Sequence, residues 1–112
     1  MKKILIIDDE SEFCEMLRIL LTKRKYEVFV ASNMESGFRI SDEIRPDTLI
    51  LDNNLPDGFG WIYTDKFLKN FPELKIILIS AQPMTTFFAG KIGPAFHFLQ
   101  KPLSLDEIIQ YL

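Results

Sequence analysis

Cysteine and histidine are almost absent from this chain, which excludes two kinds of structure. Its 112 residues include one cysteine, Cys14, and one histidine, His97, so no internal disulfide forms and no Cys/His cluster binds zinc. Cys14 stands among apolar residues at helical spacing, which predicts a small buried side chain. A chain without disulfides suits a reducing compartment, and we expect a cytoplasmic location.

Long hydrophobic runs and an excess of positive charge are also missing. No apolar stretch approaches the ~20 residues that cross a bilayer, and Asp8, Asp9 and Glu10 end the first apolar segment too early for an export signal. Acidic residues outnumber basic ones by 16 to 13, giving a formal net charge of −3. Because surfaces that bind nucleic acids are normally basic, we expect neither membrane insertion nor direct nucleic acid binding.

What is present is an ordinary globular composition with five candidate strands. The hydrophobic fraction of 47% and the length predict one domain with one core over residues 1–112. Short apolar runs at 4–7, 48–51, 76–79 and 96–99 predict strands, the first three of them central and buried on both faces. Residues 26–31 alternate and are rich in β-formers, which predicts an edge strand.

Helical spacing and capping signals lie between these runs. Helices are expected over 11–24, 61–71 and 83–92, with Trp61 packed in the core. Two more are expected to begin at capping-box pairs: Ser32 with Glu35 opens a helix that runs to Ile44, and Ser104 with Glu107 opens the last one. Pro and Gly make 55–60 a loop. This βα alternation implies a parallel sheet with helices on both faces.

Polar residues stand where the apolar runs end. Asp8-Asp9-Glu10, Asp52, Ser80 and Lys101-Pro102 each follow a different expected strand. In open α/β sheets, ligands bind just outside the carboxyl ends of the strands. We therefore expect the carboxylates, the hydroxyl and the lysine to meet in one reaction centre. Asp9 with Glu12 also has the spacing of a helix cap, but a cap alone leaves Asp8, Asp52 and Lys101 unexplained.

Such a centre suits a divalent cation and phosphoryl transfer. Mg²⁺ takes a few carboxylates plus waters, and it relieves the repulsion that raises the pKa of clustered acids. A carboxylate beside a divalent cation, a lysine and a hydroxyl can accept a phosphoryl group, because the cation and the ammonium neutralise charge on the phosphoryl oxygens.

These residues match the pattern of a known family. Asp8-Asp9-Glu10, Asp52, Leu55-Pro56, Gly60, Ser80-Ala81 and Lys101-Pro102, in this order, resemble the receiver domain of bacterial two-component response regulators over essentially the whole chain. The resemblance implies an α/β, flavodoxin-like (βα)5 fold, with a doubly wound parallel five-stranded sheet in strand order 2-1-3-4-5. It implies a domain that catalyses its own phosphorylation and dephosphorylation.

The resemblance also implies individual roles at the acid site. Asp52 looks like the phosphoacceptor, which takes the phosphoryl group from a sensor histidine kinase or a phosphotransfer protein. Asp9 resembles the direct Mg²⁺ ligand and Asp8 one that acts mainly through water. Asp52 and the backbone carbonyl of Asn54 would complete the metal shell. Lys101 would pair with a phosphoryl oxygen.

The remaining implied roles concern switching and lifetime. Ser80 would move to bond the phosphoryl group, and Phe98, at the family's aromatic switch position, would then pack inward and change the 80–112 face. Asn54 and Gln82, two residues after Asp52 and Ser80, flank the path of an attacking water. Their amides can orient water without acting as bases, so we expect moderate self-dephosphorylation.

The likeness is weaker over residues 82–95. The stretch from Ser80 to Lys101 is about one residue short for the family, and the apolar segment 83–92 predicts either a helix tucked into the core or an exposed patch. We expect a homodimer or output partner to use the 83–112 face. The last helix ends a turn or two early, so the chain is either a single-domain regulator or part of a longer protein.

Three other functions compete with the phosphoacceptor. A pseudo-receiver would use the same fold only to bind a partner; the intact acid set argues against it and the unusual 82–95 stretch argues for it. A flavin or nucleotide carrier needs a hydroxyl- or glycine-rich loop where Asp8-Asp9-Glu10 places anions. A metal-dependent phosphatase needs a second acid two residues after Asp52, where Asn54 stands.

Overall fold

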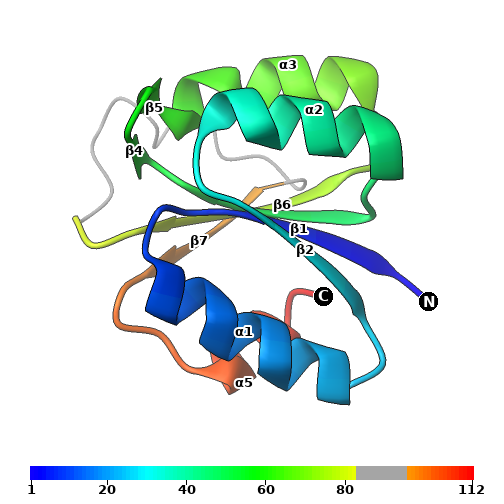
Figure 1. Cartoon of the computed structure of the whole chain (residues 1–112), viewed down its shortest axis with the longest axis vertical. Coiled ribbons are helices and arrows are strands. Elements are labelled where there is room, and N and C mark those ends of the chain that lie inside the picture. The colour runs from blue at the N-terminus through cyan, green and yellow to red at the C-terminus, as the bar shows by residue number, and fades with distance from the viewer. Residues whose placement is uncertain (83–95) are drawn as a thin grey trace.

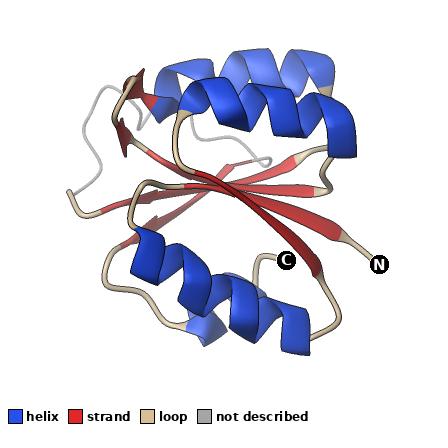
Figure 2. Ribbon diagram, viewed as in Figure 1, coloured by secondary structure: helices blue, strands red, loops and turns tan. Residues whose placement is uncertain are grey.

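The computed structural model describes residues 1–82 and 96–112, which form a parallel sheet between two layers of helices. Helices α2 and α3 cover one face, and α1 and α5 cover the other (Figures 1 and 2). The five-stranded sheet has the order β2-β1-β3-β6-β7. In chain order along this sheet that is 2-1-3-4-5, so the expected flavodoxin-like α/β fold is confirmed.

The expected strands and most expected helices are found within a few residues of their predicted bounds. The elements are β1 Lys3–Ile7, α1 Ser11–Lys23, β2 Glu27–Ala31, α2 Met34–Ile44, β3 Thr48–Asp52, β4 Asn54–Leu55, β5 Gly58–Phe59, the 3-10 helix η1 Gly60–Tyr63, α3 Thr64–Asn70, β6 Lys75–Ser80, β7 Phe96–Gln100 and α5 Leu105–Ile109. The helix predicted over 83–92 and the patch considered there lie outside the described residues.

The central strands are buried on both faces because each face packs on its own helical layer. In β1, Leu5 and Ile7 join the cluster that includes Met34 and Phe67, from α2 and α3. Their neighbours Ile4 and Ile6 point to the opposite cluster, with Leu17 and Leu21 of α1. Strand residues alternate between faces, so burial of both faces requires an uninterrupted apolar run. β2 lies at the sheet edge, as predicted from its alternation.

One predicted helix start differs from the structure and another is confirmed. The Ser32–Glu35 capping box is wrong, because Asn33 is the N-cap of α2 and its Oδ1 accepts a hydrogen bond from Ser36 N at 2.8 Å. Asn is a strong N-cap residue and here takes the position one residue later. The cap that was considered as an alternative role for Asp9 and Glu12 is not formed, since Glu10 is the N-cap residue of α1 and makes no side-chain cap hydrogen bond. The Ser104–Glu107 capping box is present in full.

The segment after Asp52 is more ordered than the loop predicted for 55–60. β4 and β5 form a small antiparallel hairpin, and Gly58 has the positive φ of +135° that its turn requires. The predicted helix 61–71 begins as the 3-10 turn η1 and becomes α-helical at Thr64. This hairpin and turn place Trp61, 3% exposed, beneath the carboxyl end of β3.

Within residues 1–82 and 96–112, no helix is long and apolar enough to cross a membrane.

Cys14 is buried in α1, as predicted, and its Sγ donates to the carbonyl of Asp8 at 3.2 Å. Burial raises the pKa of this thiol to about 12, so it is not a reactive nucleophile.

Candidate functional site

The carboxyl ends of the strands bring the predicted site residues together. Asp8 directly follows β1, Asp52 and Ser80 are the last residues of β3 and β6, and Lys101 directly follows β7. One carboxylate oxygen each from Asp8, Asp9 and Asp52 lie within 4.8 Å of one another. Asp8 and Asp52 are buried, at 1% and 4% exposure, whereas Asp9 is exposed. The cluster therefore has two buried acids and a third that faces solvent.

Asp8 is held on both carboxylate oxygens. Its Oδ1 accepts a hydrogen bond from Glu10 N at 2.9 Å, and its Oδ2 forms an ion pair with Lys101 Nζ at 2.8 Å. Burial raises the pKa of Asp8, although the hydrogen bonds from Lys101 and Glu10 oppose the rise. The backbone N of Asp8 donates to Ala31 O, which ties the site to the edge strand β2. Asp8 is thus held by the Lys101 ammonium and by hydrogen bonds with backbone groups.

Asp52 has fewer stabilising partners than Asp8. The Nζ of Lys101 is 4.0 Å from its Oδ1, well beyond hydrogen-bond distance. Burial and, second, the charge of Asp8 raise the pKa of Asp52 to about 6, against the opposing charge of Lys101. Near neutral pH this side chain is mostly ionised but poorly compensated, which favours binding of an added cation.

Lys101 is the cation that links the acids, and Glu10 helps to hold it. Its Nζ lies 3.1 Å from Glu10 Oε1 and 4.7 Å from the centre of the Phe13 ring, and 9% of its side chain is exposed. Burial alone would lower the pKa of Lys101, but hydrogen bonds to Asp8 and Glu10 outweigh it, and the pKa is raised. Sequence reasoning placed Glu10 in the motif without a role, because a contact 91 residues away leaves no local signal.

Ser80 and the two amide residues surround the acids less closely. Ser80 is buried, its Oγ accepts a hydrogen bond from Gln82 N at 3.0 Å, and its carbonyl accepts one from Lys101 N at 2.8 Å. The side chains of Asn54 and Gln82 are exposed. The structure therefore places Ser80 against the backbone of the lysine and leaves both amides open to water.

The loop after Asp52 contains residues that sequence reasoning missed. Asn53 Oδ1 accepts a hydrogen bond from Trp61 N at 3.2 Å, and the Asn53 carbonyl accepts one from Gly60 N at 3.0 Å. A Cβ on Gly60 would lie 2.3 Å from the Asp52 carbonyl oxygen, so only glycine fits there.

Phe98, the predicted switch residue, is half-buried and meets Trp61 edge to face.

The donor set fits Mg²⁺. The clustered side chains offer only carboxylate oxygens, the hard ligands that Mg²⁺ prefers, and one of them is solvent-exposed so that coordinated waters have room. The raised pKa of Asp52 shows that the buried negative charge is incompletely neutralised by Lys101. Asp8, Asp9 and Asp52 are the side chains that would hold the ion.

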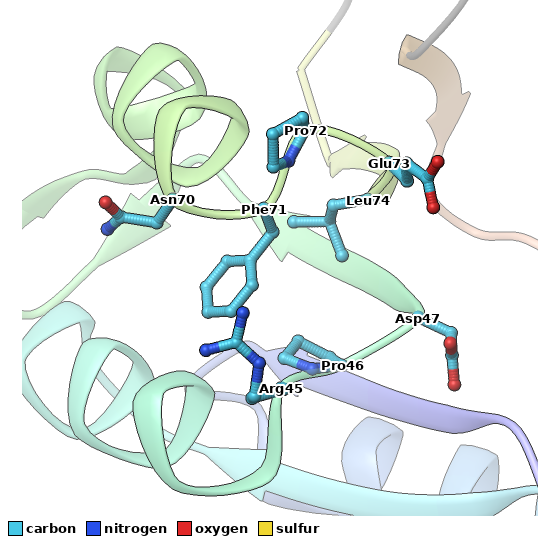
Figure 3. A pocket seen from close by; sticks show the side chains of 8 residues that line it. All are labelled: Arg45, Pro46, Asp47, Asn70, Phe71, Pro72, Glu73 and Leu74. Atoms are coloured by element: carbon cyan, nitrogen blue, oxygen red, sulfur yellow. The ribbon is translucent and has the colours of Figure 1, made fainter.

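Among the described residues, one open groove adjoins this site and another lies at the opposite end of the sheet. A groove of about 430 Å³ is lined by Glu10, Phe13, Lys101 and their neighbours. The other, about 420 Å³, is formed by the turns before β3 and β6, at the opposite end of these strands (Figure 3). There the Arg45 guanidinium lies 5.3 Å from the centre of the Phe71 ring. The Arg45 groove is remote from the acids and takes no part in their chemistry.

Comparison with known proteins decides the family. Residues 4–112 match the family model described as the response regulator receiver domain. The chain belongs to this receiver domain family. The chemotaxis protein CheY of Thermotoga maritima is 32% identical over 114 residues, covering 99% of this chain and 94% of CheY. The transcriptional regulatory protein KdpE of Mycobacterium tuberculosis is 34% identical over 113 residues.

The coverage of these relatives differs. The match to KdpE takes in 100% of the receiver domain described here and 50% of KdpE, so this chain spans half the length of that relative. The response regulator TrrA of Thermotoga maritima, whose structure was solved in complex with Mg²⁺-BeF, superposes with a TM-score of 0.81 at 28% identity. That superposition covers 98% of this chain and 95% of TrrA. The chain is a phosphoacceptor domain of two-component signalling.

Proposed function

We propose that this receiver domain accepts a phosphoryl group on Asp52 from a phosphohistidine of a sensor histidine kinase or phosphotransfer protein. The observation that carries the proposal is the convergence of three carboxylates within 4.8 Å, next to a lysine whose side chain is 9% exposed. Among them Asp52 is the buried acid that no cation of the described residues contacts closely, since Lys101 Nζ lies 2.8 Å from Asp8 Oδ2 but 4.0 Å from Asp52 Oδ1, so we take the Asp52 oxygen as the one available for bond formation.

The transfer is a substitution at phosphorus. An oxygen of the Asp52 carboxylate attacks the phosphorus of the phosphoimidazole, a P–O bond forms and the P–N bond breaks. The electron pair of the broken bond stays on the imidazole nitrogen, which takes a proton from solvent. The product on this chain is an acyl phosphate, which water later hydrolyses back to carboxylate and inorganic phosphate.

We assign the metal ligands as Asp9 directly, Asp8 mainly through water, Asp52 and the backbone carbonyl of Asn54. The ion pair of Asp8 with Lys101 supports its indirect role, since that carboxylate already has a close cation. Bound Mg²⁺ supplies positive charge that stabilises the phosphoryl oxygens in the transition state.

The switch follows from what Lys101 and Ser80 contact. An added phosphoryl group on Asp52 attracts the Lys101 ammonium, now 4.0 Å away, and the Ser80 hydroxyl. Ser80 and Lys101 are joined through their backbones, and Phe98 lies in the same strand as Gln100, the partner of Ser80. Their displacement moves Phe98 inward and changes the 80–112 face. The exposed amides of Asn54 and Gln82 orient water and set a moderate lifetime.

The partners are assigned from the positions of the groove beside Lys101 and of the 83–112 face. A phosphohistidine protein reaches Asp52 from the side of the groove beside Lys101, and a homodimer or output partner uses the 83–112 face, of which 96–112 is described. Residues 1–112 act as one receiver domain in the cytoplasm.

The test is intact mass after incubation with acetyl phosphate, with Mg²⁺ or with a chelator. We expect a single phosphoryl adduct that requires Mg²⁺, is absent in Asp52→Asn, and persists in Asp42→Asn, a matched change at an exposed acid of α2. An adduct that survives Asp52→Asn contradicts the acceptor assignment. A folded wild-type protein that takes no phosphoryl group from acetyl phosphate or from phosphorylated kinase supports the pseudo-receiver.

A further inference from the structure

A set of contacts through Trp61 joins the acceptor strand to β7 without passing through Lys101. Trp61 is the one tryptophan of the chain and lies buried in η1. Its indole Nε1 donates to the Leu51 carbonyl at 3.2 Å, and its backbone N donates to Asn53 Oδ1 at 3.2 Å. Leu51 and Asn53 are the residues on either side of Asp52. Trp61 is therefore bound to both neighbours of the proposed acceptor.

The backbone around Trp61 is held against the same loop. Gly60 approaches the Asp52 carbonyl so closely that no side chain fits between them, and its N donates to the Asn53 carbonyl. On the other side, Thr64 Oγ1 donates to the Trp61 carbonyl at 3.1 Å. Because these contacts fix both backbone and ring, Trp61 moves with the acceptor loop rather than independently of it.

The far side of the indole meets the predicted switch residue. The rings of Trp61 and Phe98 pack edge to face, with centroids 5.5 Å apart and an interplanar angle of 87°. This geometry is favourable only over a limited range of orientations, so a shift of one ring displaces the other. Phe98 lies in β7 three residues before Lys101, which places the two residues on the same strand and its exit.

We propose that Trp61 is a positioning residue that couples the state of Asp52 to Phe98 and the β7 face. The inference rests on the proposed function, because it takes Asp52 as the acceptor. A phosphoryl group adds bulk and charge between Leu51, whose carbonyl accepts from the indole, and Asn53, whose Oδ1 accepts from the Trp61 backbone N. Trp61 passes the resulting shift to Phe98, in parallel with the path through Ser80 and Lys101.

A buried aromatic can also serve only to fill the core, and Phe67 provides that comparison. Phe67 is 1% exposed, belongs to the same hydrophobic cluster as Trp61 and stacks on Phe38 with centroids 5.1 Å apart. Its ring contact lies between α3 and α2, and not with the neighbours of Asp52. Phe67→Leu therefore removes a comparable packing contribution without touching the proposed coupling.

The experiment measures hydrogen exchange of the β7 amides before and after phosphorylation by acetyl phosphate with Mg²⁺. Intact mass on the same samples records the phosphoryl adduct. The proteins are the wild type, Trp61→Leu, Trp61→Phe and Phe67→Leu. Trp61→Phe keeps an aromatic ring but removes the indole donor to Leu51, and it serves if the leucine variant does not fold.

We expect the wild type to form the adduct and to change its β7 exchange. Trp61→Leu forms the adduct, but the change in exchange falls about two- to tenfold, the range that loss of one aromatic pair produces. Trp61→Phe loses part of the response, whereas Phe67→Leu retains it in full.

The outcomes distinguish failure of the coupling from failure of the proposed function. A full β7 response in phosphorylated Trp61→Leu and Trp61→Phe overturns the coupling and leaves Asp52 as the acceptor. An equal loss in the Trp61 variants and Phe67→Leu also overturns it, because packing alone then explains the effect. Absence of an adduct in the folded wild type, with acetyl phosphate and with phosphorylated kinase as donors, contradicts the proposed function and, with it, the coupling.

Discussion

Two aspartates with nearly the same burial have different properties because their partners differ. Asp8 pairs with Lys101 at 2.8 Å and accepts a backbone hydrogen bond, whereas Asp52 lies 4.0 Å from the same ammonium. Burial penalises both charges, and Asp52 receives less compensation. At the scale of the residue, Asp8 is held by a close cation and a backbone amide, whereas Asp52 has no cation in close contact among the described residues.

The raised pKa of Asp52 makes its ionisation costly for the folded state. Its pKa is about 6 when folded against 3.8 in a model peptide, so the cost is absent below pH 3.8, grows as the pH rises, and is complete above about 6. We expect metal-free Asp52→Asn to be more stable than the wild type at pH 7, by about 1–3 kcal/mol. Urea unfolding at pH 7 and at pH 3.5 measures this difference.

The gain from Asp52→Asn should shrink toward zero at the lower pH, where both states are protonated. Asp42→Asn, at an exposed site, provides the charge-matched control and should change stability little at either pH. Equal stability of Asp52→Asn and wild type at pH 7 would mean that the Asp52 charge is fully compensated in the folded domain.

At the scale of the element, the β4–β5 hairpin fixes the loop after the acceptor. The Asp57 carboxylate accepts hydrogen bonds from Met34 N at 2.9 Å and Glu35 N at 3.1 Å, so it joins the hairpin to the start of α2. The hydrogen bond from Met34 N and, next, that from Glu35 N lower the pKa of Asp57. At the other end of the hairpin, Gly60 lies so close to the Asp52 carbonyl that an added Cβ would clash with it.

Gly60 is the position in this element least able to accept a side chain. A Cβ there would meet the Asp52 carbonyl oxygen at 2.3 Å, and a backbone atom in a central strand cannot move aside cheaply. We expect Gly60→Ala to lower the free energy of unfolding by about 1–3 kcal/mol in urea denaturation. It should also slow phosphoryl uptake, because the strain falls on the acceptor residue.

Gly37→Ala is the matched control for Gly60→Ala. Its Cβ would approach the Ile7 Cδ1 at 2.4 Å, which is the tip of a side chain that can rotate, and alanine favours the helix. We expect a smaller loss of stability than for Gly60→Ala. A larger loss for Gly37→Ala would show that the contact with the backbone at Gly60 relaxes easily.

At the scale of the whole molecule, the parallel topology gathers negative charge at one edge of the sheet. Asp8 follows β1 and Asp52 ends β3, and these strands are neighbours in the sheet. Crossover connections bring every strand into the sheet in the same direction, so residues far apart in sequence meet at the same edge. As a result, like charges cluster at this edge, and Lys101 offsets their repulsion only in part.

Relief of this repulsion should make Mg²⁺ a stabilising ligand of the whole domain. A ligand that binds only the folded state stabilises it by about 2.7 kcal/mol at 100 times its Kd. We expect the thermal midpoint to rise with Mg²⁺ and to return on chelation. The rise should be lost in Asp9→Asn and retained in Asp42→Asn. A rise of the same size in Asp9→Asn would place the ion elsewhere.

The sequence pattern alone was sufficient for the strands, their alternation with helices and the residues at the strand ends, whereas the strand order was implied by the family resemblance. An apolar run of four or five residues is required wherever a strand is covered on both faces, so β1, β3 and β6 could be found without coordinates. The Ser104–Glu107 capping box is a contact within one turn and was predicted correctly. The roles assigned to Asp52, Asp9, Ser80 and Phe98 remain predictions for the experiments above.

Only the tertiary structure decided the contacts between distant segments. The Asp57 carboxylate accepts hydrogen bonds from the first amides of α2, Met34 N and Glu35 N, from 23 and 22 residues away. Glu10 on Lys101, and Trp61 between Leu51 and Phe98, likewise join separate elements. Local sequence patterns reflect interactions between residues a few positions apart. Contacts between distant segments depend on how the helices and strands pack together, and only the tertiary structure gives those distances.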